Sequence, residues 1–161
     1  MTAKINDLHI KQVEAWERKN ADGLSLEKQL KLFEKAFHAI EQRTLKTLSN
    51  VTFQVVLDRV LLQNTDKFPF LSEVKLEPQG LNFEVLIRNS ASHNSGQLTE
   101  ALRCLLVELL NVLGNITADI LTEPLHKELH KVTSDYQQPE EKEENKILRQ
   151  INSGRKKSER I

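Results

Sequence analysis

The stretch LTEALRCLLVELLNVLGNITADIL, residues 98–121, decides the fold of this chain. Its apolar side chains fall on nearly every face of the helix that their spacing predicts. Such a helix is normally covered on most sides, because a single buried face would leave leucines in water. We therefore expect it at the centre of a domain or in an oligomer interface. The apolar residues of this stretch include Leu102, Leu105, Leu106, Val107, Leu109, Leu110, Val112, Leu113, Ile116, Ile120 and Leu121.

The length and the charge balance indicate one domain without a bias towards a charged partner. The 161 residues include 23 Lys and Arg and 23 Asp and Glu, so no net charge attracts nucleic acid or anionic lipid. The basic run 155–157 stands beside Glu159 and is too short to predict nucleic-acid binding. We find no export leader and no apolar run of membrane-spanning length, and we expect a cytoplasmic protein without membrane contact. The single Cys104 is expected to pack as a small hydrophobe.

Residues 1–23 predict a short N-terminal amphipathic helix. Ile5, Leu8, Val13 and Trp16 lie close to helical spacing, and the pattern ends at the Asn-Ala-Asp-Gly run of residues 20–23. Trp16 could anchor this helix in a partner's groove. The favoured alternative is that it folds back on its own core, because amphipathic helices most often serve tertiary packing.

Residues 24–136 predict a helical core domain. Ser25 is expected to cap a long helix that runs to about Gln63 and bends after Ser49. Its outer face, which includes Glu41, is expected in solvent. The Pro of residues 67–70 ends this helix, and a β-hairpin is predicted near 72–88; the alternative is that residues 81–88 begin another helix. The apolar stripe of the long helix contains Leu26, Leu30, Phe33, Phe37, Ile40, Thr44, Leu48 and Val51.

Residues 137–161 predict a charged flexible tail, because they offer little apolar surface to bury. The fold class is mainly α: a long-helix bundle with a small hairpin excursion and a disordered C-terminal tail. Two long helices cannot enclose the leucine-rich helix, so we expect a homodimer that supplies the missing cover. The predicted interface consists of Leu102, Leu105, Leu109, Leu113, Phe33, Phe37 and Ile40.

His126 and His130 form the candidate metal site of the chain. Residues four apart share one face of a helix, and two imidazoles so placed can hold a metal ion. A zinc protease would need a glutamate directly after the first histidine, where this chain has Lys127. The alternative is that these side chains interact with the negative end of a helix dipole.

His38 is the candidate phosphoacceptor. The segment HAIEQRT, residues 38–44, resembles the phosphoacceptor box of sensor histidine kinases over one or two helical turns. The resemblance implies a phosphorelay protein in which the nucleophilic imidazole of His38 accepts phosphate. No glycine-rich lid of an ATP-binding domain follows, so the chain would accept or relay phosphate only. The alternative is a solvated histidine on a helix face.

The sequence contains no recognisable catalytic constellation, neither a glycine-rich phosphate cradle nor a nucleophile elbow. We expect no enzymatic activity and no cofactor. The expected function is that of a non-catalytic regulatory or adaptor protein, which associates through helices with itself and with an unidentified protein partner. A second alternative to this function, besides the phosphorelay, is a module for an apolar small ligand, with the leucine-rich helix lining a cavity between Phe37, Phe53 and Phe83.

Overall fold

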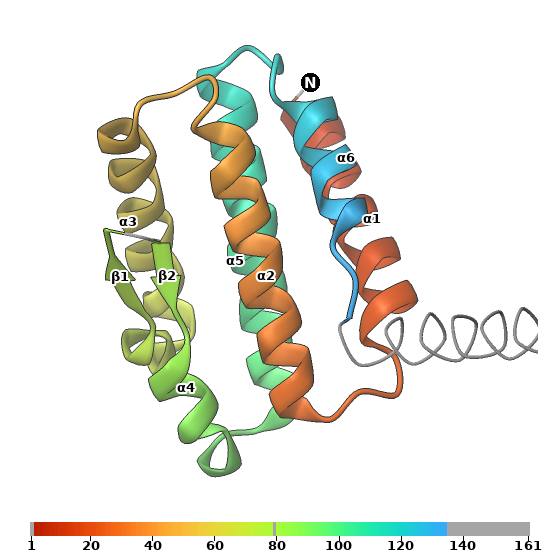
Figure 1. Cartoon of the computed structure of the whole chain (residues 1–161), viewed down its shortest axis with the longest axis vertical. Coiled ribbons are helices and arrows are strands. Elements are labelled where there is room, and N and C mark those ends of the chain that lie inside the picture. Colours follow the sequence, from red (N-terminus) through yellow and green to blue (C-terminus); the bar gives the residue numbers. More distant parts are fainter. Residues whose placement is uncertain (1, 79, 135–161) are drawn as a thin grey trace, which may run out of the picture.

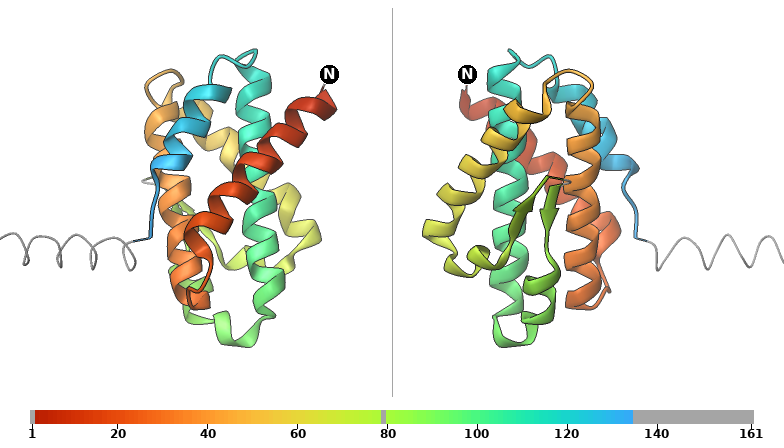
Figure 2. Two further views of the ribbon diagram at one scale, coloured as in Figure 1. Left: turned by 90° about the vertical axis from the view of Figure 1, so that its right-hand side faces the viewer. Right: turned by 60° about the vertical axis from the view of Figure 1, so that its left-hand side comes forward.

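The computed structural model describes residues 2–78 and 80–134, and these form a mainly helical domain with one small hairpin. The central pair of helices is α2 (Leu26–Thr44) and α5 (Ser95–Ile116). Helix α3 (Asn50–Lys67) flanks this pair on one side, and α1 (Thr2–Ala21) and α6 (Thr122–Lys131) flank it on the other (Figure 1). Helix α1 crosses α5 obliquely (Figure 2). The mainly helical class predicted from the sequence is therefore confirmed.

Helix α5 is the leucine-rich helix and lies at the centre of the core. It packs against α1, α2, α3 and α6, which is the cover that its apolar faces require. It ends at Ile116, earlier than the apolar pattern suggested. Ala118 and Asp119 take left-handed backbone angles there, and the Asp119 amide donates to the Gly114 carbonyl at 2.7 Å. The chain thus turns sharply into α6, which packs back onto the bundle.

The predicted long helix from Ser25 to Gln63 is two helices, and this corrects the sequence interpretation. Ser25 caps α2 as expected and accepts a hydrogen bond from the Lys28 amide. A turn over residues 45–49 then separates α2 from α3. Ser49 caps α3 by accepting from the Thr52 amide at 3.1 Å. The Ser49 hydroxyl caps the start of α3, which competes with continuation of α2. The chain therefore reverses its direction after α2, where the sequence predicted only a bend (Figure 1).

The hairpin is shorter than predicted. Strands β1 (Lys75–Glu77) and β2 (Gly80–Asn82) pair antiparallel, with Leu76 opposite Leu81. Helix α4 (Glu84–Arg88) follows, so the hairpin ends at Asn82 and does not reach residue 88. The alternative that residues 81–88 begin another helix is correct for residues 84–88. The side chain of Asn82 accepts a hydrogen bond from the Glu84 amide, the first residue of α4, at 2.8 Å. Short 3-10 turns, η1 (Pro69–Glu73) and η2 (Ser90–Ser92), lead into β1 and out of α4.

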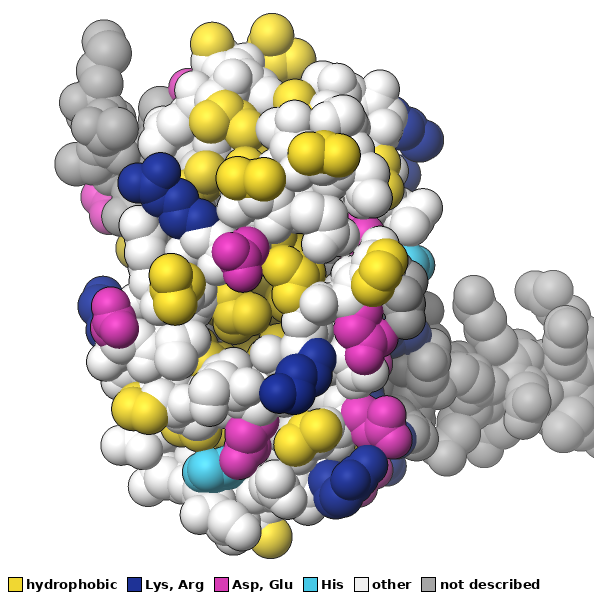
Figure 3. Space-filling model, turned by 90° about the vertical axis from the view of Figure 1, so that its left-hand side faces the viewer, with side chains coloured by type: hydrophobic (Ala, Val, Ile, Leu, Met, Phe, Trp, Pro, Cys, Tyr) yellow, Lys and Arg dark blue, Asp and Glu magenta, His cyan; other side chains and the backbone are white. Residues whose placement is uncertain are grey.

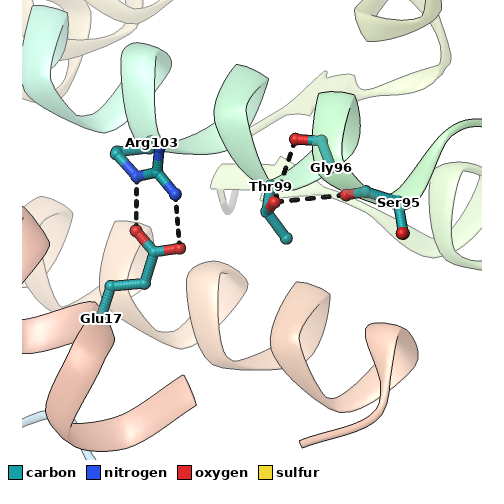
Figure 4. Close-up of polar contacts among 5 residues, drawn as sticks. All are labelled: Glu17, Ser95, Gly96, Thr99 and Arg103. Carbon is teal, nitrogen blue, oxygen red and sulfur yellow. Dashed lines mark hydrogen bonds and ion pairs between the residues drawn. The ribbon is translucent and has the colours of Figure 1, made fainter. Parts of the chain in front are cut away.

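Helix α1 is part of the domain and holds to α5 through a two-point ion pair. The Glu17 carboxylate accepts two hydrogen bonds from the Arg103 guanidinium, one from Nε at 2.6 Å and one from Nη2 at 2.9 Å (Figure 4). The fork of a guanidinium matches both carboxylate oxygens, which fixes the geometry of the contact. Trp16 lies fully buried on the same helix, and its indole Nε1 donates to the Val132 carbonyl at 2.9 Å. Trp16 therefore packs in the core of its own chain, as the favoured alternative predicted.

The residues predicted as a dimer interface are buried within one chain. None of them is more than 4% exposed, because α1, α3 and α6 complete the cover that two long helices could not provide. The premise that a second subunit must cover the leucine-rich helix is therefore wrong. The tail predicted at 137–161 lies outside the described residues. The buried set named for the interface is Phe33, Phe37, Ile40, Leu102, Leu105, Leu109 and Leu113.

Candidate binding groove

A groove runs along the outer face of α2. The hairpin forms one wall. Residues 131–133, which comprise the last residue of α6 and the two residues after it, form the other. Figure 1 shows α2 between these two segments. Its volume is about 750 Å³. We call it the α2 groove, and its lining comprises Glu34, Lys35, Phe37, His38, Ala39, Glu41, Glu77, Gly80, Leu81, Asn82, Lys131, Val132 and Thr133.

The hairpin wall is attached to α2 by contacts at successive helical turns. The Glu34 carboxylate accepts the backbone amide of Phe83 at 3.1 Å. The rings of Phe37 and Phe83 pack edge to face with centroids 5.6 Å apart, a favoured aromatic geometry. Residues three and four apart share a helix face. Glu34 and Phe37, and Glu41 one turn later, therefore all contact the hairpin segment, and together they fix it along the length of the groove.

Glu41 is the unusual residue of the groove. Its side chain was expected in solvent, but the residue is only 4% exposed. It packs against Gly80, where an added Cβ would lie 2.4 Å from the Glu41 Oε2 atom. No hydrogen bond reaches its carboxylate from the described part of the chain. Burial raises the pKa of Glu41, and the nearby His38 imidazole opposes that shift to a smaller extent.

The opposite wall is tied to the core. The Lys35 ammonium donates a hydrogen bond to the Thr133 carbonyl at 3.4 Å. The Val132 carbonyl accepts a hydrogen bond from the Trp16 indole. The wall therefore connects the α2 groove directly with α1. Since Val132 also lines the groove, a ligand that moves this wall would alter the surroundings of Trp16.

His38 lies exposed on α2 and lines the groove. This position leaves the imidazole accessible, as both the phosphoacceptor and the solvated-histidine interpretations require. Phosphotransfer by His38 therefore stays a prediction. The structure adds one fact to the sequence, namely that His38 shares its groove with a buried carboxyl group.

His126 and His130 occupy different environments, although they lie on the same helix. His126 is buried, and its Nε2 atom is 2.8 Å from Nδ1 of His9 on α1. Burial, with the neighbouring imidazoles, lowers the pKa of His126 to about 4. His130 is exposed and bonds to Gln12. The partner of His126 in the structure is therefore His9, and among the described residues no group of three or more His, Cys, Asp or Glu side chains is arranged to hold a metal ion.

Sequence reasoning missed Glu41 and Gly80 as site residues. The sequence places Gly80 only within the predicted hairpin, and it places Glu41 on a solvated helix face. Their contact joins segments that are distant in the chain, so no local pattern signals it. The predicted cavity between Phe37, Phe53 and Phe83 also differs from the site: Phe37 alone of these lines the α2 groove, whereas all three rings are buried in the core.

Comparison with protein families, with curated proteins and with solved structures finds no match to this chain. Within the described ranges, no helix is both long enough and apolar enough to cross a membrane. The function is therefore argued from the groove itself.

Proposed function

We propose that this protein is a non-catalytic binding module of a regulatory or adaptor kind, and that the α2 groove holds a small organic ligand. The observation that carries the proposal is the size and lining of the groove. A volume of about 750 Å³ lies within the usual range for ligand sites. Phe37, Leu81 and Val132 supply apolar surface, and polar side chains surround them.

The link between the groove and α1 supports a regulatory role. A ligand in contact with Val132 acts on the wall that receives the Trp16 indole hydrogen bond. Binding would then change the contact between the wall of residues 131–133 and α1. A ligand shifts such an equilibrium only by its difference in affinity between the two arrangements, so contact with the wall itself is the essential feature.

The proposal is tested by native mass spectrometry of the full chain purified without denaturation. We expect an added mass that is lost on unfolding, and no added mass on an Ala39→Trp variant, whose indole fills the groove. Leu62→Trp places the same bulk on the exposed face of α3 and should retain the added mass. The emission of Trp16, the one tryptophan of the wild-type chain, should also respond to 1-hexanol. A bare polypeptide mass together with unresponsive emission would contradict the proposal.

A second candidate function, self-association, is favoured by the outer face of α3. Val51, Val55 and Leu62 lie on one face of this helix and are 73%, 64% and 67% exposed. Figure 3 shows apolar side chains across this side of the molecule. We propose a second copy of the chain as the occupant, because an antiparallel α3 pair about a two-fold axis would set Val55 of one copy beside Leu62 of the other.

Light scattering on size-separated protein tests this second candidate. We expect twice the chain mass for the wild type and a single chain mass for Val55→Asp. Gln63→Asp, which adds the same charge on another face of α3, should leave the mass unchanged. A single chain mass for the wild type at high concentration would refute self-association through this face.

A further inference from the structure

We infer that the α2 groove selects ligands that carry an ammonium group on an apolar stem, and that the Glu41 carboxylate receives this group. The inference rests on the proposed binding function of the groove and names the chemistry of its ligand. It follows from three features: a buried carboxylate that receives no hydrogen bond from the described residues, the charges around it, and the apolar surface beside it.

The first feature is the state of the Glu41 carboxylate. Glu41 is 4% exposed and lines the groove, and no described residue donates a hydrogen bond to it. The carboxylate oxygens are not among the fully enclosed polar atoms that lack a partner in the described chain, so they open into the groove. Burial of the rest of the side chain limits how well water can solvate this charge. The close approach of Gly80 fixes the carboxylate on the hairpin side. A ligand that brings donors and positive charge would satisfy this group.

The second feature is the arrangement of charges. Glu34 and Glu77 share the hairpin side of the groove with Glu41. The ammonium group of Lys131 instead lies 3.1 Å from Glu128, and that of Lys35 reaches the opposite wall at Thr133. His38 stands between the walls and is the one imidazole that lines the groove.

These positions make the hairpin side acidic. A cationic group placed there gains favourable interactions with several carboxylates. An anionic group would be repelled by the same residues.

The third feature is the apolar surface next to Glu41. Phe37, Leu81 and Val132 line the groove together with the carboxylate. They offer a place for a hydrocarbon stem while its ammonium group reaches Glu41. Burial of a hydrocarbon stem against this surface is favourable, so we infer an amphipathic amine and not a small inorganic cation.

Isothermal titration of the full chain with three probes of equal length tests the inference: hexylammonium, 1-hexanol and hexanoate. We expect hexylammonium to bind at least about tenfold more tightly than 1-hexanol near neutral pH, a difference of about 1.4 kcal/mol, and hexanoate to bind most weakly. In Glu41→Gln the preference for hexylammonium should disappear. Glu27→Gln, on the same helix and outside the α2 groove, should retain it.

The outcomes separate the inference from the function on which it rests. Equal binding of hexylammonium and 1-hexanol would overturn the selection of ammonium groups and leave the groove as a binding site. Tighter binding of hexanoate would overturn it as well, and would identify Glu41 as a protonated donor. Failure of all three probes would overturn both the inference and the proposed function.

The pH dependence of the wild-type chain gives a second measurement that needs no variant. Burial raises the pKa of Glu41, so its carboxylate becomes neutral at a higher pH than an ordinary glutamate. Binding of hexylammonium should therefore weaken as the pH falls through that raised value. The affinity for 1-hexanol should stay constant over the same range, and parallel loss of both affinities would count against the role of Glu41.

Discussion

Replacement of Gly80 by alanine should destabilise the protein through two separate effects. Gly80 has a φ of +123°, and an added Cβ would lie 2.4 Å from Oε2 of Glu41. Backbone strain at such an angle costs about 1–3 kcal/mol. The carboxylate must also move by about 1 Å to restore ordinary contact. Because Glu41 is buried, this movement disturbs its packing, and we expect a total loss of about 2–4 kcal/mol in the free energy of unfolding.

Gly23→Ala is the matched control for backbone strain. Gly23 also has a positive φ, +80°, but an added Cβ there meets no atom within 4 Å. Its replacement should cost about 1–2 kcal/mol. The contribution of the contact with Glu41 is isolated by introducing Gly80→Ala into a Glu41→Ala variant. There the loss in the free energy of unfolding caused by Gly80→Ala should be about 1 kcal/mol smaller than in the wild type. Urea unfolding followed by circular dichroism measures the wild type and the four variants. An unchanged cost of Gly80→Ala in the Glu41→Ala background would show that the contact with Glu41 contributes nothing to the loss of stability.

Three further predictions concern the core. Trp16→Phe leaves the Val132 carbonyl without its donor and should lower the free energy of unfolding by about 2–4 kcal/mol, measured by urea unfolding. Because the pKa of His126 is lowered to about 4, this residue binds more protons in the unfolded chain than in the folded chain between about pH 4 and 6.5. The contribution of His126 to stability should be constant above that window and should fall by about 3 kcal/mol as the pH drops through it. The raised pKa of Glu41 acts in the opposite direction, so the contribution of His126 is read from the difference between the wild type and a His126 variant. His126→Gln should reduce this loss, whereas His130→Gln should not. Leu109→Ala should cost about 2–5 kcal/mol at every protein concentration; a cost that varies with concentration would indicate an intermolecular position instead.

The sequence predicts those elements whose signals are local. Ser25 caps α2 because its hydroxyl precedes a clear apolar stripe. Residues 98–116 form a buried helix because their leucines, together with Ala101 and Val107, make an unusually wide apolar face. The turn between α2 and α3 was harder to predict, since the apolar stripe continues across it. Only Ser49, a good capping residue next to Asn50, indicates that the chain reverses there.

The sequence does not predict the features that depend on contacts between distant segments. Glu41 has the spacing of a solvated residue, and its burial comes from the hairpin that packs over α2. His126 pairs with His9 because α1 crosses α6, whereas a four-residue spacing suggests His130 as its partner. Trp16 is ambiguous for the same reason. An amphipathic helix has one pattern whether it covers its own core or the groove of another protein.

The most direct test of the α2 groove is a two-dimensional ¹H–¹⁵N NMR titration of the full chain with hexylammonium. We expect shift changes at the amides of Glu41, Gly80 and Val132, which lie on the floor and on both walls of the groove. The amides of Val51 and Leu62 on α3 should not respond. Shifts confined to α3, or no saturable shift at the three groove positions, would contradict the assignment of the groove as the binding site.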